Sequence, residues 1–265
     1  MKKIIYMFRD MAWLLEIMNF RDMLHVLYQL KIIKKNIVKY KYFNHELFIS
    51  NDGPVIYHMV FSTRKIKNLV DNIELENVNV CFDVGANSGL FTYFLKNKYP
   101  DTEVHCFEPS PGLIECIELN LKPFKNVFIR KQAICDVSGS ANFYVNTASQ
   151  QTNSLIADSV TPFCEGNSMH KISVDSNTLD QYCAQNDIES VDVLKVDIQG
   201  AEKALLDGAT DTLVNTSISI FEITFLDVAI FETLEILLNN YNKYKVVNEV
   251  KAGADIFFYN KRGST

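Results

Sequence analysis

Two glycines and an aspartate follow a short apolar run, a pattern that can bind a small ligand through the backbone. Asp83 precedes Gly85, Asn87 and Gly89, and a helical pattern of apolar residues begins at Leu90. This order predicts a buried strand, a glycine turn and a helix. Glycine has no side chain to block a close approach, so the N–H groups of such a turn can contact a ligand.

Glu108 supplies the second half of this pattern. It lies 23 residues after Gly85, at the end of the next expected strand, 103–107. Rossmann-like sites place at this distance the carboxylate that binds a ribose hydroxyl pair. The turn and Glu108 together indicate a ligand that contains adenosine. In the alternative interpretation, Gly85 and Gly89 only shape a tight turn.

The glycine spacing differs from the common phosphate-binding fingerprints. Dinucleotide sites have GxGxxG and phosphate loops have GxxxxGK[ST], whereas Gly85 and Gly89 are four apart and no lysine follows the second. Asp83 would repel a pyrophosphate but suits the ammonium of a bound amino acid. S-adenosylmethionine (SAM) combines that ammonium with an adenosine and no phosphate, so it is the expected cofactor.

A second group of residues has the chemistry to move a proton. Lys195 and Asp197 are two residues apart and share a face on a regular strand, and Glu222 ends the strand expected next. A hydroxyl that accepts a methyl group must lose its proton, which requires a general base or a bound metal. We expect Asp197 to point into the crevice, Lys195 to orient it and Glu222 to lie across from it. The alternative is a structural ion pair between Lys195 and Asp197.

These motifs together resemble the FkbM-type family of SAM-dependent methyltransferases. Residues 83–89 (DVGANSG) resemble its first motif, and residues 107–111 (FEPSP) resemble its second. Residues 195–202 (KVDIQGAE) resemble its KxDxEGxE signature, and Glu222 resembles its late glutamate. One departure is Gln199, which stands where the family usually has an acid. The resemblance implies methyl transfer to a hydroxyl of a sugar, nucleotide-activated or in a surface polysaccharide, or of a related metabolite.

The site residues that we expect fall into three groups. The cofactor residues, from the methionine end of SAM to its adenine, are Asp83, Gly85, Asn87, Gly89, Glu108, Ala133, Ile134 and Asp136. The catalytic residues are Asp197, Lys195 and Glu222. The acceptor residues are Asn153, Ser154 and Gln199, of which the first two belong to a polar loop, 147–170, that we expect to be a substrate lid. For Asp136, an ordinary turn residue is the alternative.

The order of elements predicts a class I methyltransferase, a Rossmann-like α/β fold over residues 76–265. It has a seven-stranded, mostly parallel sheet that ends in an antiparallel hairpin joined through Ala252 and Gly253. Its third strand is expected over 126–134, and strands 140–146 and 171–175 form an inserted β-hairpin.

Residues 1–75 are expected to form an extension of helices and short strands. Amphipathic patterns predict two helices within residues 1–40, and strands are expected around the turn 51–54. The extension holds 12 Lys and Arg against 7 Asp and Glu, whereas residues 76–265 hold 14 against 25. Charged residues interrupt its apolar stretch, which therefore predicts neither a secretory signal nor a membrane span. The basic and apolar surface of these helices has several interpretations. Among the functional ones, we rank a homodimer contact above contact with an anionic membrane surface or with substrate phosphates. The alternative without a function is a solvated helix face.

The composition of the 265 residues limits the kinds of partner and the cellular location that we expect. With 48% hydrophobic and 22% charged residues, the chain can bury a sizeable core. The net charge of −6 and the pI near 5.4 argue against a nucleic-acid partner. None of the six cysteines forms a CxxC pair and no histidine pair has metal spacing, so we expect a cytoplasmic location and no metal site.

Two alternatives to O-methyl transfer stay open. Gln199 favours a SAM-binding subunit that is non-catalytic or scaffolding, because the amide carries no charge. An N-methyltransferase acting on a small-molecule amine needs much the same crevice. A short-chain oxidoreductase is disfavoured, because the spacing of Gly85 and Gly89 differs from that of dinucleotide sites.

Overall fold

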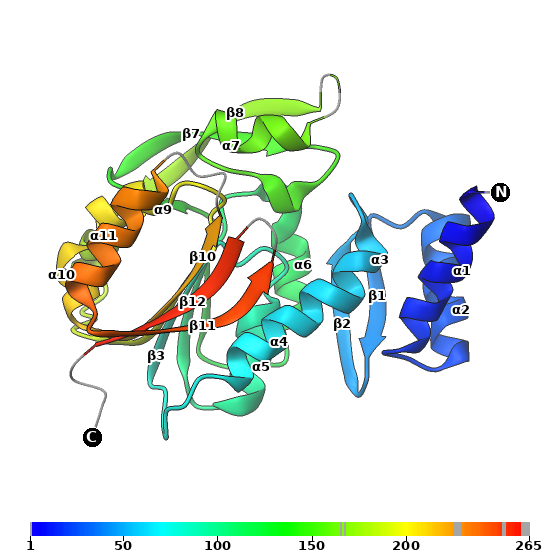
Figure 1. Ribbon diagram of the computed structural model, residues 1–265, viewed down its shortest axis with the longest axis horizontal. Coiled ribbons are helices and arrows are strands. Elements are labelled where there is room, and N and C mark those ends of the chain that lie inside the picture. The colour runs from blue at the N-terminus through cyan, green and yellow to red at the C-terminus, as the bar shows by residue number, and fades with distance from the viewer. Residues whose placement is uncertain (1, 165, 167, 225–228, 251–252, 261–265) are drawn as a thin grey trace.

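A seven-stranded sheet forms the centre of the computed structural model, which describes all residues except 1, 165, 167, 225–228, 251–252 and 261–265 (Figure 1). Its strands are β3 (Val80–Val84), β4 (Glu103–Phe107), β5 (Val127–Arg130), β9 (Val191–Val196), β10 (Thr216–Thr224), β11 (Lys243–Val250) and β12 (Gly253–Tyr259). The spatial order is β11-β12-β10-β9-β3-β4-β5, and β12 runs antiparallel to both of its neighbours. The expected class I fold with its closing hairpin is confirmed. The turn expected at Ala252 lies outside the described residues.

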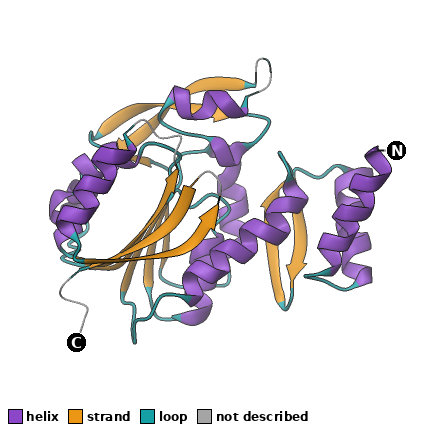
Figure 2. Cartoon of the chain, viewed as in Figure 1, coloured by secondary structure: helices purple, strands orange, loops and turns teal. Residues whose placement is uncertain are grey.

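Helices cover both faces of this sheet (Figure 2). One face packs on α4 (Thr63–Asp71), α5 (Leu90–Lys98) and α6 (Pro111–Leu121). The other packs on α8 (Leu179–Gln185), α9 (Glu202–Asp207), α10 (Thr210–Val214) and α11 (Ile230–Asn240). Strand residues alternate between these layers: Cys81 and Val193 join the first cluster, and Phe82 and Leu194 join the second. Because both faces are covered, the central strands are near-continuous apolar runs.

The extension packs against the sheet domain. Its elements are α1 (Lys2–Leu15), α2 (Phe20–Tyr28), the π-helix η1 (Gln29–Ile33), β1 (Ile37–Tyr42), β2 (His45–Ser50), α3 (Val55–Tyr57) and the π-helix η2 (His58–Ser62), which leads into α4. The Asn120 amide of α6 joins β2 to the glycine turn, because it accepts from Phe48 N and donates to Phe48 O and Ser88 O. One hydrophobic cluster therefore crosses the expected boundary at residue 75. No helix in the described part of the chain is long and apolar enough to cross a membrane.

Two local expectations about strands are wrong. The first hairpin turns at Phe43, whose φ is +52°, and residues 55–62 are helical, so the strands do not flank the turn 51–54. The expected third strand, 126–134, is divided, because the chain leaves the main sheet after Arg130.

The inserted hairpin is confirmed, within a separate three-stranded sheet. Strand β7 (Gly139–Asn146) pairs antiparallel with β8 (Met169–Asn177), and β6 (Ala133–Ile134) pairs parallel with β8. The described part of the segment between β7 and β8 contains three short helices, η3 (Gln150–Thr152), α7 (Ala157–Val160) and η4 (Thr161–Phe163). In Figure 1 this part lies over the carboxyl ends of the central strands.

The geometry of the glycine turn predicts different losses of stability for alanine at Gly85 and at Gly89. Gly85 and Gly89 have φ values of +74° and +77°, so alanine is strained at either position. A Cβ at Gly85 would lie 1.9 Å from the backbone oxygen of Asp197, whereas one at Gly89 would meet the flexible Leu121 side chain at 3.3 Å. We expect Gly89→Ala to lower the free energy of unfolding by about 1–2 kcal/mol and Gly85→Ala by about 3 kcal/mol or more, measured by urea unfolding. Equal losses would contradict the assigned contact with Asp197.

Candidate active site

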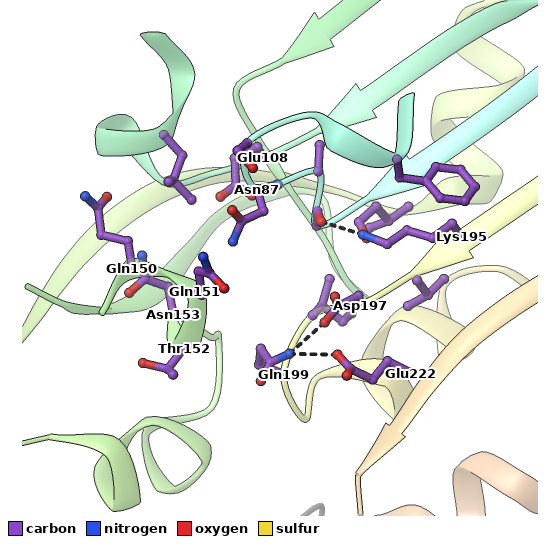
Figure 3. Close-up of a pocket in the computed structure, with 18 of the residues that line it drawn as sticks. Asn87, Glu108, Gln150, Gln151, Thr152, Asn153, Lys195, Asp197, Gln199 and Glu222 are labelled. Atoms are coloured by element: carbon purple, nitrogen blue, oxygen red, sulfur yellow. Dashed lines mark hydrogen bonds between the residues drawn. The ribbon is translucent and has the colours of Figure 1, made fainter. Parts of the chain in front are cut away.

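A cavity of about 540 Å³ opens where β3, β4, β9 and β10 end. The carboxyl ends of parallel strands are the usual ligand site in open α/β sheets. Three further segments line the wall: one side of η2 and α4, the residues after β5, and the loop after β7. Figure 3 shows the last of these, where residues 150–153 face the cavity. This volume lies within the range of small-molecule sites.

The glycine turn and Glu108 form one rigid unit. Glu108 is buried, and its two carboxylate oxygens accept from Asn87 N and Ser110 N, each at 2.9 Å. Burial raises the pKa of Glu108 to about 7, although the two N–H donors lower it. Each oxygen keeps a second lone pair, which suits a pair of ribose hydroxyls. The expected cofactor therefore fits this part of the cavity, where Gly85 and Asn87 also line the wall.

Asp83 does not line the cavity, contrary to its expected contact with the ammonium of SAM. Its side chain is fully buried beneath the turn, where Thr92 donates to it at 2.8 Å. Lys195 Nζ lies 3.2 Å from Asp83 Oδ1 and donates to Gly85 O at 2.6 Å. Burial lowers the pKa of Lys195, but Asp83 and Asp197 raise it further, so its net shift is upward. Lys195 thus fixes the turn, and its ion-pair partner is Asp83 rather than Asp197.

Two further expected cofactor residues also stand apart from the cavity. Gly89 begins helix α5 in a left-handed conformation and packs toward Leu121. Asp136 is exposed, because the chain turns outward after β6. In contrast, Ala133 and Ile134 are buried and line the cavity, as expected for an adenine pocket.

Asp197, Gln199 and Glu222 meet at the opposite wall of the cavity (Figure 3). Gln199 has a φ of +54°, and its Nε2 donates to Asp197 Oδ1 at 2.6 Å and to Glu222 Oε2 at 3.2 Å. The Asp197 charge and then burial raise the pKa of Glu222 to about 8. Burial opposes the ionisation of Asp197, but Lys195 and Glu222 together lower its pKa. The two neighbouring carboxyls thus have pKa values that are driven apart, downward for Asp197 and upward for Glu222.

Lys65 and Asp255 belong to this cluster and were not expected. Lys65 Nζ lies 2.5 Å from Glu222 Oε1 and 3.1 Å from Asp255 Oδ1. Burial lowers the pKa of Lys65, but the two carboxylates raise it above its ordinary value. Asp255 interrupts the apolar strand β12, a signal that the sequence did contain. Within the described residues, no three His, Cys, Asp or Glu side chains are arranged to hold a metal ion.

Hydrogen bonds attach the loop after β7 to two neighbouring parts of the cavity wall, at Gln199 and at Ser110. Ser154 does not line the cavity, because its buried hydroxyl donates to Gln199 O at 2.8 Å. Asn153 lines the cavity, and its Nδ2 donates to Ser110 Oγ at 3.1 Å. The Gln150 amide accepts from Ser110 Oγ at 3.3 Å and donates to Asp52 Oδ2 at 3.2 Å. This loop therefore links the start of α6 to the extension.

His58 adds an unexpected imidazole to the cavity wall. Its Nδ1 lies 2.9 Å from Ser62 Oγ, and its buried Nε2 has no hydrogen-bond partner in the structure. Burial lowers the pKa of His58 to about 4, although Asp52 raises it. The ring is therefore neutral at neutral pH. His58, Ser62, Lys65 and Leu69 line the cavity at helical spacing, which the sequence showed only as part of an amphipathic pattern.

Comparison with known proteins gives a family match. A family model described as the methyltransferase FkbM domain matches residues 83–246. The 2-O-methyltransferase NoeI of Sinorhizobium fredii is 26% identical over 145 residues, which are 52% of this chain and 60% of that protein. Methyltransferase 1 of Beauveria bassiana is 29% identical over 144 residues, 49% of this chain and 57% of that protein. The matched region thus spans less than two thirds of these relatives. Among solved structures, M. capricolum TrmK with S-adenosyl-homocysteine is 12% identical with a TM-score of 0.44, covering 77% of this chain and 70% of that chain.

The pKa of Glu108 predicts how cofactor affinity varies with pH. Ribose hydroxyls donate to a carboxylate, so binding favours the ionised form of Glu108, which predominates above its pKa of about 7. We expect the affinity for S-adenosylhomocysteine to rise about tenfold from about pH 6 to about pH 8 in calorimetry, and to become nearly flat in Glu108→Gln. Glu222→Gln is the matched control and keeps the rise. A rise that survives in Glu108→Gln would show that another group controls binding.

Proposed function

Because the chain belongs to the FkbM methyltransferase domain family, we propose that it is a SAM-dependent O-methyltransferase. The observation that carries this proposal is the pair of carboxyls, Asp197 and Glu222, which the Gln199 amide bridges on the wall of the same cavity as Glu108 and Gly85. SAM supplies the methyl group when it is bound. Glu108 would hold its ribose, and Gly85 and Asn87 would approach its amino-acid end.

Asp197 is the proposed proton acceptor. As the O–CH₃ bond forms and the S–CH₃ bond breaks, the acceptor hydroxyl gives up its proton, and ionised Asp197 takes it. Gln199 holds Asp197 through its amide, and Lys65 holds Glu222, so neither carboxyl is free to turn away. Fixed positions of this kind supply much of the rate in an in-line displacement. The amide at position 199 is compatible with this role, since it orients the base without replacing it.

The proposed acceptor is a hydroxyl of a sugar, free, nucleotide-activated or in a surface polysaccharide. Amide and hydroxyl side chains dominate the polar lining of the cavity, which suits a neutral, polyhydroxylated molecule: Ser62, Gln150, Gln151, Thr152, Asn153 and Gln199. The two lysines of the described wall, Lys65 and Lys195, both contact carboxylates. A phosphate of a nucleotide-linked acceptor would therefore lie outside the inner cavity. The name of the Sinorhizobium relative, a 2-O-methyltransferase, also supports an oxygen acceptor.

We propose a cytoplasmic location for this activity. All six cysteines are unpaired, including the fully buried Cys81, Cys106 and Cys116. Free buried thiols are typical of proteins kept in a reducing compartment.

Replacement of the proposed base tests the function. We expect Asp197→Asn to lower the rate of S-adenosylhomocysteine formation with sugar acceptors by about 100-fold or more, while the cofactor affinity measured by calorimetry stays within about twofold of wild type. Asp136→Asn, at an exposed position, is the matched control and keeps both values. Cofactor binding without turnover in the wild type would favour a non-catalytic subunit. Turnover with amines alone would favour an N-methyltransferase.

His58 predicts a separate effect on acceptor use. His58 lines the cavity and its Nε2 has no hydrogen-bond partner in the structure, so we propose that a hydroxyl of the acceptor molecule becomes that partner, as donor or acceptor according to the tautomer. We expect His58→Ala to lower kcat/KM for the acceptor about tenfold without changing affinity for S-adenosylhomocysteine. The exposed His170→Ala is the control and leaves both unchanged. Loss of cofactor affinity in His58→Ala would place His58 on the cofactor side instead.

A further inference from the structure

A stripe of exposed apolar side chains runs along the second helix of the extension. Phe20, Leu24, Tyr28 and Ile32 recur at four-residue intervals along α2 and η1, and their exposed fractions are 60%, 49%, 50% and 70%. Residues at this spacing lie on one side of a helix. Single exposed apolar residues are ordinary, but a continuous row marks an interaction surface. We call these four residues the α2 stripe.

The opposite side of the same helix is firmly anchored. Met23 and Val26 are buried in the core of the extension. The buried Gln29 amide donates to Lys39 O at 2.8 Å and accepts from Lys39 N at 3.1 Å, so it joins η1 to β1. The α2 stripe is therefore displayed by a folded, packed helix, and its exposure is not the result of a frayed end.

Basic side chains accompany the α2 stripe. Arg21, Lys31, Lys34 and Lys35 are exposed, and none of them has an ion-pair partner among the residues that the structure describes. The nearby Asp22 carboxylate is already neutralised by Lys41 at 3.1 Å. The surface around the stripe thus combines apolar area with unpaired positive charge.

The combination of apolar area and positive charge distinguishes between two possible partners of the α2 stripe, a second copy of the chain and a lipid surface. In a two-fold dimer each copy presents the same patch, so the four cations of one copy would face the four of the other. An anionic lipid surface instead complements both the apolar stripe and its basic rim. We infer that the α2 stripe binds the surface of membranes containing anionic lipid, with α2 lying in the interface. Tyr28 suits this position, because its ring is apolar and its hydroxyl reaches water.

The charge distribution fixes how the protein would lie on such a surface. Residues 1–75 have an excess of basic residues, and residues 76–265 an excess of acidic ones. In Figure 1, α1 and α2 lie at the end of the molecule away from the main sheet. The basic end therefore faces the lipid, and the acidic domain is held off it. This inference does not depend on the proposed enzymatic activity.

Vesicle co-sedimentation of the full chain tests the inference. We expect binding to phosphatidylcholine vesicles that contain phosphatidylglycerol to exceed binding to phosphatidylcholine alone by about tenfold, and to weaken at high salt. The double variant Leu24→Glu/Ile32→Glu should lose about tenfold or more of this binding. Both positions are exposed, so the fold is retained, which circular dichroism verifies. Phe231→Glu, at an exposed apolar position on α11, is the matched control and keeps wild-type binding.

Three results would overturn the inference. The first is equal binding of the wild type and the double variant. The second is equal binding to vesicles with and without phosphatidylglycerol. The third is a concentration-dependent dimer in sedimentation velocity that the double variant abolishes, because it would assign the α2 stripe to a second copy of the chain.

Discussion

The buried contact between Lys195 and Asp83 is the constraint on which the cavity depends. These residues are cross-strand neighbours in the parallel register of β3 and β9, and both point toward the α5 layer. The lysine also donates to Gly85 O, so one side chain ties the end of β9 to the turn that follows β3. An unpaired buried charge is strongly destabilising, and this pairing therefore fixes the turn, Asn87 and, through it, Glu108.

The extension contributes to the site as directly as the sheet does. Lys65 reaches from α4 to Glu222 on β10 and Asp255 on β12, and it supplies the positive charge that this acidic wall requires. His58 reaches the cavity from the same continuous helix. A catalytic domain cut at residue 75 would therefore lose part of its cavity wall, and the like charges of Glu222 and Asp255 would be left unbalanced.

Local sequence patterns predicted the fold, because it depends on short strand–turn–helix units. Of the expected cofactor residues, Gly85, Asn87, Glu108, Ala133 and Ile134 line the cavity, whereas Asp83, Gly89 and Asp136 do not. Glu108 could be placed from its distance to Gly85 alone. The direction of Asp83 also follows from strand alternation, since it shares a face with Cys81 and points away from the ligand edge. Asp197 lies just past the end of β9 at Val196, and Lys195 forms its ion pair with Asp83 instead. Three site residues could not be predicted in this way: Lys65, Asp255 and His58. They reach the site only because distant segments pack together, and the spacing of residues along the sequence does not reveal such packing.

The hydrogen bonds through Ser110 and Gln150 have a consequence for how the two ligands influence each other. Glu108 is bound by Ser110 N, Ser110 Oγ donates to Gln150, and Gln150 donates to Asp52 beside His58. A continuous polar network thus runs from the cofactor side of the cavity to the side formed by the extension. If movement at one end is transmitted through these bonds to the other, the cofactor and acceptor affinities are thermodynamically coupled, and the factor by which each changes the other must then be the same in both directions.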